Sequence, residues 1–150
     1  MRRVENEDYI HCLARFENGA MGIFESSRVA HGRKLGLAFE IVGSKGTIIF
    51  DQERMNELKV YNGDEKEGEA GFKTILIGPG HPDFINFCPA AGHGLGYNDL
   101  KIIEVDKLLE AVEKGVKPPV NFRQACKIEQ VIDACVISSE NGQWVRVADI

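Results

Sequence analysis

The sequence predicts an α+β fold: a largely antiparallel, open-faced sheet of about six strands, followed by two helices that cover one of its faces. The first half of the chain consists of short segments with alternating or β-rich composition, separated by turns at Gly or Asn. From residue 98 onward, apolar residues recur at helical spacing. Strands that precede helices, instead of alternating with them, argue against a parallel nucleotide-binding sheet, so no Rossmann domain is expected.

The first two strands form a predicted hairpin. Residues 8–16 alternate between two faces, and residues 20–29 form the partner strand. Between them, Glu17–Gly19 supply an Asn-Gly turn, which permits positive φ in a tight hairpin. The sequence leaves open which face meets the helices, because both carry apolar side chains: Ile10, Ala14 and Phe16 on one face, Tyr9 and Leu13 on the other.

Four more strands are predicted downstream. A Ser-Lys turn bounded by glycines connects the first two of them, and the acidic, glycine-bearing stretch 62–71 connects the last two. Together with the hairpin they make a meander of ordinary sheet size. The four segments are residues 35–43, 46–51, 56–61 and 72–78.

Two helices follow the strands. The first runs from Asn98 to a stop at Gly115, with two prolines just beyond it. Asn121 can cap the second, which stops at Asn141-Gly142, and Gln124 is placed to complete a reciprocal cap. Residues 143–147 are predicted to form a short closing strand. The apolar stripes are Ile102, Val105, Leu108, Leu109 and Val112 in the first helix, and Ala125, Ile128, Ile132, Cys135 and Val136 in the second.

Length, charge and cysteine usage limit the class of protein. A chain of 150 residues corresponds to one ordinary domain, and no apolar run approaches the roughly 20 residues needed to cross a bilayer. The amino terminus has no secretory h-region, so we expect a cytoplasmic location. A net charge of -5 without a basic stripe argues against a nucleic-acid partner. The four cysteines are scattered without a C-x-x-C pair, which favours reduced thiols.

The segment Gly80–Asp99 contains two histidines, a cysteine and several aromatic residues. It also contains a cluster of glycines at Gly92–Gly96. This cluster lacks the complete G-x-G-x-x-G spacing, follows an irregular proline-bearing stretch and lies outside any βαβ unit. The context of a dinucleotide-binding fingerprint is therefore missing. The chain also has no G-x-S-x-G elbow that would indicate a nucleophile.

The same segment offers a possible metal site. His81, Cys88 and His93, with or without Asp83, are usable ligand types. Their spacing matches no zinc finger or catalytic zinc pattern, and histidines and cysteines in loops are commonly structural or merely exposed. We therefore assign no metal ligand and keep metal binding as a minor alternative.

Several motifs occur in a characteristic order along the chain. E-I-x-G-x-x-G lies on the strand pair of residues 40–46, GHGLGYND precedes an acidic helix, and A-x-x-x-S-x-x-x-G-x-W-V-x-V lies near the carboxy terminus. In this order they resemble the carboxy-terminal domain of the glucose-fructose oxidoreductase and inositol dehydrogenase (Gfo/Idh/MocA) family. The resemblance spans almost the whole chain.

This resemblance implies a two-domain NAD(P)-dependent sugar or polyol dehydrogenase whose amino-terminal Rossmann domain binds the nicotinamide cofactor. The family's catalytic lysine lies in a Glu-Lys-Pro motif of that domain, so Lys117, which follows Val116 in a loop, does not inherit the role. The family's catalytic Asp and His lie on a helix that precedes the first strand found here, so His11 and His31 do not inherit theirs. We expect no catalytic or cofactor-binding residue in residues 1–150, and no activity of this chain alone.

In such a dehydrogenase this domain would shape the sugar pocket and carry the oligomer interface. His93 and Tyr97 would offer hydrogen bonds to hydroxyl groups, or else only pin their loop to the sheet. Arg28, at the end of the second strand, is a further substrate-binding candidate, with a surface salt bridge as its alternative role. Since family members commonly pair through this sheet, we expect a homo-oligomer that uses the sheet face opposite the helices.

Three hypotheses follow from the sequence. The chain is part of a sugar or polyol oxidoreductase, a stand-alone binding or assembly module without catalysis, or a metal-binding protein. The first implies a small sugar or polyol as substrate, and NAD or NADP as the cofactor of the full-length protein but not of this chain alone. No membrane partner is expected.

Overall fold

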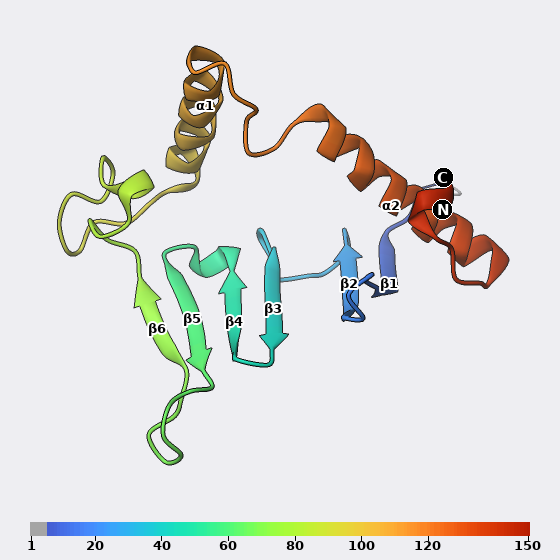
Figure 1. The fold of residues 1–150 in the computed structure, drawn as a ribbon, viewed down its shortest axis with the longest axis horizontal. Helices are drawn as coiled ribbons and strands as arrows, with labels where there is room; N and C mark the ends of the chain where they lie inside the picture. The colour runs from blue at the N-terminus through green and yellow to red at the C-terminus, as the bar shows by residue number, and fades with distance from the viewer. Residues whose placement is uncertain (1–5) are drawn as a thin grey trace. The chain divides into compact units, whose positions relative to one another are not determined.

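The computed structural model describes residues 6–150, which divide into two compact units. One unit joins residues 6–32 to residues 119–150, and the other comprises Arg33–Pro118. The described residues form six strands, two α-helices and three short 3-10 helices, in the order drawn in Figure 1. Every strand pair is antiparallel, which confirms the predicted α+β class. The strands are divided between a two-stranded and a four-stranded sheet.

The first unit contains the predicted hairpin. Strands β1 (Tyr9–Arg15) and β2 (Met21–Ser27) pair along their whole length. Gly19 in the connecting turn has φ of 87°, which the absence of a Cβ permits. The hairpin therefore forms where the Asn-Gly signal placed it.

The structure also decides which face of β1 is the inner one. Ile10, Cys12 and Ala14 are half-buried, whereas Tyr9 and Leu13 are each 54% exposed. Ile10 and Cys12 line a cleft together with apolar side chains of helix α2 (Phe122–Asn141). Within this unit α2 therefore covers the face that carries Ile10 and Cys12.

The second unit contains four strands in the order β3-β4-β5-β6. Gly46, at the start of β4, pairs with Asn62 at the end of β5, and a Cβ built on it would lie 2.2 Å from the carbonyl oxygen of Tyr61. Only glycine allows the backbones to approach this closely. The strands are β3 (Ala38–Gly43), β4 (Gly46–Asp51), β5 (Glu57–Asn62) and β6 (Lys73–Leu76), with the 3-10 helix η1 (Gln52–Arg54) between β4 and β5.

Both helices form where the sequence predicts them. At the start of α2, Asn121 Oδ1 accepts from the Gln124 N–H at 3.2 Å, and Gln124 Oε1 accepts from the Asn121 N–H at 2.9 Å. This confirms the predicted reciprocal cap. Helix α1 (Tyr97–Glu113) begins after Gly96. Both helices are followed by a glycine with positive φ, 62° at Gly115 and 65° at Gly142.

The predicted closing strand is wrong. Residues 143–146 are irregular, and Val147–Asp149 form the 3-10 helix η3. The Ser138 hydroxyl donates to the Gln143 carbonyl at 2.6 Å, which takes an acceptor that a strand ladder would use. The Trp144 ring lies under the Arg15 guanidinium, 5.6 Å from it, so this segment is fixed by side-chain contacts instead of strand pairing.

Few side chains are fully buried in either unit. The core residues are Cys88, Leu95 and Ala111 in the second unit and Ala134 in the first. The predicted apolar stripe of α1 stays at least half exposed, from 50% at Leu108 to 71% at Val112. Across residues 6–150, no helix has both the length and the apolar character needed to cross a membrane.

Candidate functional site

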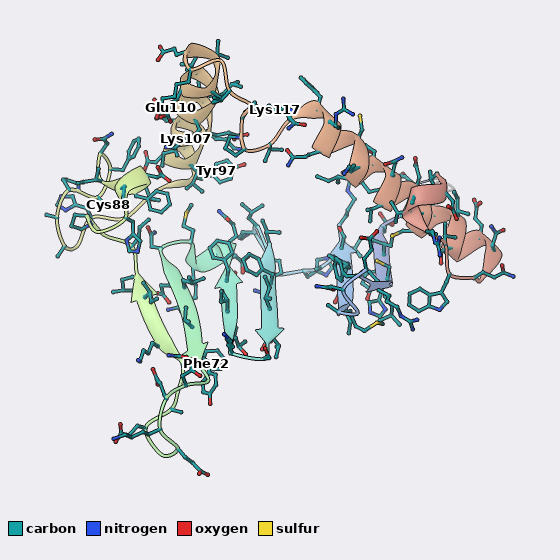
Figure 2. All side chains as sticks on the ribbon, viewed as in Figure 1. Phe72, Cys88, Tyr97, Lys107, Glu110 and Lys117 are labelled. Carbon is teal, nitrogen blue, oxygen red and sulfur yellow. The ribbon has the colours of Figure 1, made fainter. Side chains whose placement is uncertain are left out.

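The segment that leads into α1 is folded by local hydrogen bonds. The His81 N–H donates to the Gly78 carbonyl at 3.0 Å, and the Gly78 N–H donates to His81 Nδ1 at 3.2 Å. The short helix η2 (Pro82–Phe84) follows, and the Phe84 carbonyl accepts from the Cys88 N–H at 2.8 Å. These turns place Cys88 in the interior, where none of its surface is exposed (Figure 2).

The same contacts bear on the metal hypothesis. His81 Nδ1 is engaged at Gly78, and His93 Nδ1 lies 3.1 Å from the Ala90 carbonyl. Among residues 6–150, no group of three or more His, Cys, Asp or Glu side chains is placed to hold a metal ion. His81, Asp83, Cys88 and His93 are therefore not brought together as a metal centre.

His93 and Tyr97 lie close together in sequence, at the amino-terminal end of α1. His93 is exposed, and the one hydrogen-bond partner that the described residues give its ring is the Ala90 carbonyl. Tyr97 is the first residue of α1 and is 53% exposed, with the Lys101 ammonium 5.7 Å from the centre of its ring (Figure 2). Both residues are therefore exposed on the segment that leads into α1.

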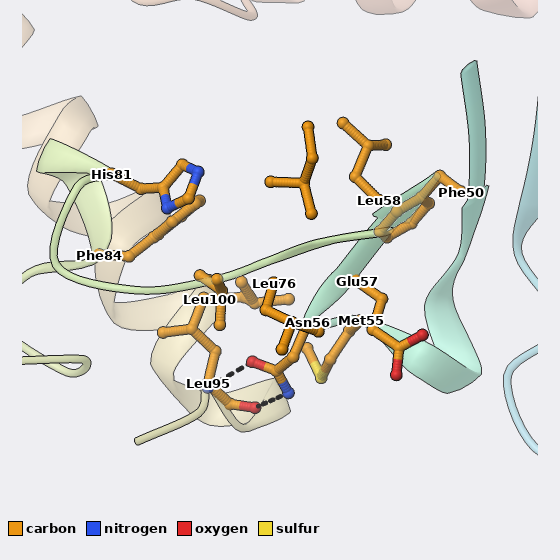
Figure 3. A pocket seen from close by; sticks show the side chains of 12 residues that line it. Phe50, Met55, Asn56, Glu57, Leu58, Leu76, His81, Phe84, Leu95 and Leu100 are labelled. Carbon is orange, nitrogen blue, oxygen red and sulfur yellow. Dashed lines mark hydrogen bonds between the residues drawn. The ribbon is translucent and has the colours of Figure 1, made fainter. Parts of the chain in front are cut away.

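The loop that carries them is anchored by Asn56, a residue that sequence reasoning missed. Asn56 Oδ1 accepts from the Leu95 N–H at 2.6 Å, and Asn56 Nδ2 donates to the Leu95 carbonyl at 3.0 Å (Figure 3). Both residues border a mostly apolar cavity of about 300 Å³, which His81, Phe84 and Leu100 also line. In the sequence, Asn56 reads only as the first residue of a strand, and no local signal indicates a partner 39 residues away.

The last glycine of the cluster Gly92–Gly96 takes part in a helix cap. The Gly96 N–H, at the amino-terminal end of α1, donates to Asp99 Oδ2 at 2.7 Å. The N–H at the start of α1 is therefore paired with a carboxylate of the first helical turn.

Helix α1 is tied to η2 by charge. Lys107 Nζ lies 2.7 Å from Asp83 Oδ1 and 3.5 Å from Glu110 Oε2. The hydrogen bond to Asp83 raises the pKa of Lys107 above its ordinary value. The pKa of Glu110 is lowered, first by its hydrogen bond to Lys114 and also by the charge of Lys107. These exposed pairs orient the helix more than they stabilise it.

Arg28 belongs to the other unit. Its N–H donates to the Asp8 carbonyl at 2.9 Å, and its side chain lines the cleft between the hairpin and α2. This cleft has a volume of about 470 Å³ and includes the Cys12 and Cys135 thiols. Burial, together with the neighbouring Cys12 thiol, raises the pKa of Cys135. His93 and Tyr97 thus lie on one local segment, whereas Arg28 lines a mostly apolar cleft of the other unit.

Lys117 lies in the loop after α1, as predicted, and is exposed (Figure 2). His31 is likewise exposed in the turn that follows β2, and His11 is an exposed residue of β1. None of these three residues lines either of the two cavities named above, and His11 lies opposite Glu25 in the hairpin.

Comparison with known proteins matches nearly the whole chain to one oxidoreductase family. Residues 1–147 match the model of an oxidoreductase family's carboxy-terminal alpha/beta domain. Levoglucosan dehydrogenase from Pseudarthrobacter phenanthrenivorans is 35% identical over 147 residues, which are 98% of this chain and 38% of that protein. The chain thus spans less than two fifths of the length of this relative.

Solved structures agree with the sequence match. An NAD binding oxidoreductase from Klebsiella pneumoniae superposes with a TM-score of 0.92 at 38% identity, over 97% of this chain and 39% of that chain. A levoglucosan dehydrogenase in complex with NADH and levoglucosan gives a TM-score of 0.92 at 35% identity, over 96% and 39%. An oxidoreductase domain protein from Kribbella flavida gives 0.89 at 38% identity, over 94% and 37%.

Proposed function

Because the chain belongs to the glucose-fructose oxidoreductase and inositol dehydrogenase (Gfo/Idh/MocA) family, as its carboxy-terminal alpha/beta domain, we propose that it shapes the substrate pocket of an NAD(P)-dependent sugar or polyol dehydrogenase. The likeness to a dehydrogenase bound to NADH and levoglucosan, over 96% of this chain, carries the proposal. In this proposal the nicotinamide is held by another domain and accepts a hydride from the sugar. Residues 6–150 supply contacts to substrate hydroxyls.

His93 and Tyr97 are the proposed contacts. His93 lies two residues before Leu95 and Tyr97 two residues after it, at the start of α1, and both side chains can donate or accept hydrogen bonds. Such groups suit hydroxyl recognition, because each sugar hydroxyl both donates and accepts. Arg28, which lines the cleft between the hairpin and α2, is proposed as a further contact.

Steady-state kinetics on the full-length oxidoreductase that contains this domain tests these roles. His93→Ala and Tyr97→Ala should each raise the KM for the sugar, on the order of tenfold per lost hydrogen bond, and leave the KM for the cofactor within about twofold. His31→Ala is the matched control, since His31 is an exposed loop histidine of the other unit. Unchanged sugar kinetics in both His93→Ala and Tyr97→Ala would refute the assignment.

We also propose that the outer face of the hairpin is an oligomer interface. Leu13 and Ile23 face each other across β1 and β2 and are 54% and 71% exposed. A cross-strand apolar pair of this kind suits a twofold contact, in which the same patch is buried on both copies. Light scattering should detect self-association that Leu13→Arg weakens. A particle that stays monomeric at every concentration would refute the interface.

A further inference from the structure

Asn56 occupies a junction between the sheet and the loop of the proposed site. It lies between η1 and β5, and its carbonyl accepts from the Ile77 N–H at 2.9 Å, just beyond β6. Its backbone is therefore fixed by two strands of the four-stranded sheet. The side chain is half-buried and points toward the segment that precedes α1 (Figure 3).

The Asn56 amide pairs with one residue through both of its polar groups. Its oxygen takes the Leu95 N–H and its nitrogen serves the Leu95 carbonyl, at 2.6 and 3.0 Å. Only one orientation of the amide satisfies both bonds, because the reversed amide would set donor against donor. Aspartate would lack the donor, and glutamine would extend one methylene further. The pairing thus fixes both the position and the rotation of the backbone at Leu95.

Gly94 makes room for this pairing. A Cβ on Gly94 would lie 3.3–3.4 Å from three atoms of the Asn56 side-chain amide. Such contacts are tighter than ordinary packing, so a side chain here would press against the amide. The glycine directly before Leu95 therefore leaves the space that the Asn56 amide needs to pair with Leu95.

The anchor lies midway between the two proposed substrate contacts. Leu95 is 6% exposed and stands two residues after His93 and two before Tyr97. On the helix side, the Gly96 N–H is held by Asp99. Within residues 6–150, the long-range hydrogen bonds that join the backbone between His93 and Tyr97 to the sheet both come from Asn56.

We propose that Asn56 is a positioning residue for sugar binding: it fixes the backbone at Leu95 and thereby the placement of His93 and Tyr97. This inference rests on the proposed function, since it assigns Asn56 a role only through those two residues. A shift of about 1 Å in a positioning element is enough to cost substantial turnover. Asn56 itself makes no contact with the substrate in this proposal.

The test measures sugar and cofactor kinetics of the full-length oxidoreductase. Asn56→Ala should raise the KM for the sugar about tenfold, through loss of two partly buried hydrogen bonds, with the KM for the cofactor within about twofold. Asn62→Ala is the matched control, because Asn62 ends β5, the strand that begins directly after Asn56, and its side chain accepts a hydrogen bond from the nearby Asp64 N–H. An equal effect of both substitutions would overturn the proposal.

A second variant separates positioning from general destabilisation. Gly94→Ala should raise the sugar KM in the wild-type background and have little further effect in Asn56→Ala, because the amide that the new Cβ would press against is then gone. Additive effects of the two substitutions would overturn the proposal. If His93→Ala and Tyr97→Ala impair sugar kinetics but Asn56→Ala does not, this inference alone is refuted. If all three variants have normal sugar kinetics, the proposed function is refuted with it.

Discussion

In the unit formed by Arg33–Pro118, several side-chain hydrogen bonds join residues far apart in the sequence. In the unit of residues 6–32 and 119–150, nearly all side-chain hydrogen bonds are local. Asn56 and Leu95 are 39 residues apart, and Glu53 bonds to Arg33 and to the Lys34 N–H. In the described part of the other unit, one side-chain hydrogen bond is long-range, from Gln130 to the Ile150 carbonyl. The other side-chain hydrogen bonds there span five residues or fewer.

The hairpin and α2 of that other unit meet instead through a mostly apolar cleft. Apolar contact is non-directional and tolerates small shifts, whereas a hydrogen bond loses its strength when its angle changes. The unit with the long-range hydrogen bonds, Arg33–Pro118, is also the one that contains His93 and Tyr97. Placing polar groups against a small hydroxylated ligand requires this kind of fixed backbone.

The largest expected effect concerns the close backbone contact in the four-stranded sheet. Gly46→Ala should lower the free energy of unfolding by about 3 kcal/mol, because the new Cβ would lie 2.2 Å from the Tyr61 carbonyl and the strands must separate. Denaturant unfolding followed by circular dichroism measures it. Gly71→Ala is the control, since nothing lies within 4 Å of a Cβ there. Equal stability of both variants would show that the sheet tolerates the strain.

A smaller effect is expected from the local cap in the other unit. Asn121→Ala should lower the free energy of unfolding by about 1 kcal/mol, because the Gln124 N–H loses its acceptor. Asn98→Ala, an exposed position in the first turn of α1, is the control. Thermal unfolding of both variants measures the difference. If Asn98→Ala is the more harmful, local capping is not what distinguishes this unit.

The Glu53 carboxylate makes the second unit sensitive to acid. Its hydrogen bond from the Lys34 N–H lowers the pKa of Glu53 below its ordinary value of 4.5, and the bond from Arg33 adds to this. A lowered folded-state pKa contributes stability above the unfolded value, which is lost as the pH falls through the folded value. Glu53→Gln should therefore flatten the loss of stability below about pH 4.5.

Urea unfolding at several acidic pH values checks this. Glu40→Gln is the control, because Glu40 forms no ion pair within residues 6–150. Parallel pH profiles for wild type and Glu53→Gln would contradict the role of this carboxylate. The effect is expected to be modest, since the group is at the surface.

Thiol labelling compares the accessibility of cysteines in the two units without any substitution. The exposed Cys126 should react first with iodoacetamide at neutral pH, and the fully buried Cys88 last. Cys135 should be slow, because burial beside Cys12 raises its pKa and reduces its thiolate fraction. Mass spectrometry of peptides over time gives the order. Labelling of Cys135 ahead of Cys126 would mean that the cleft opens in solution.

The sequence by itself determined the elements whose causes are local. Alternation, an Asn-Gly turn and a reciprocal cap involve residues at most a few positions apart, so the hairpin, both helices and the stop at Gly142 follow from the sequence. The family followed from motifs spread along the chain, which the match over residues 1–147 confirms. The closing strand failed because Ser138 and Arg15 engage that segment through side chains that no strand pattern reveals.

Only the tertiary structure decided how distant segments meet. It set Ile10 and Cys12 toward α2 and divided the strands between two sheets. Above all it joined Asn56 to Leu95, across 39 residues, at a position where the sequence offers nothing beyond an ordinary strand beginning. The physical reason is that a hydrogen bond depends on where two groups lie in space, and chain folding brings such groups together without leaving a local pattern in the sequence.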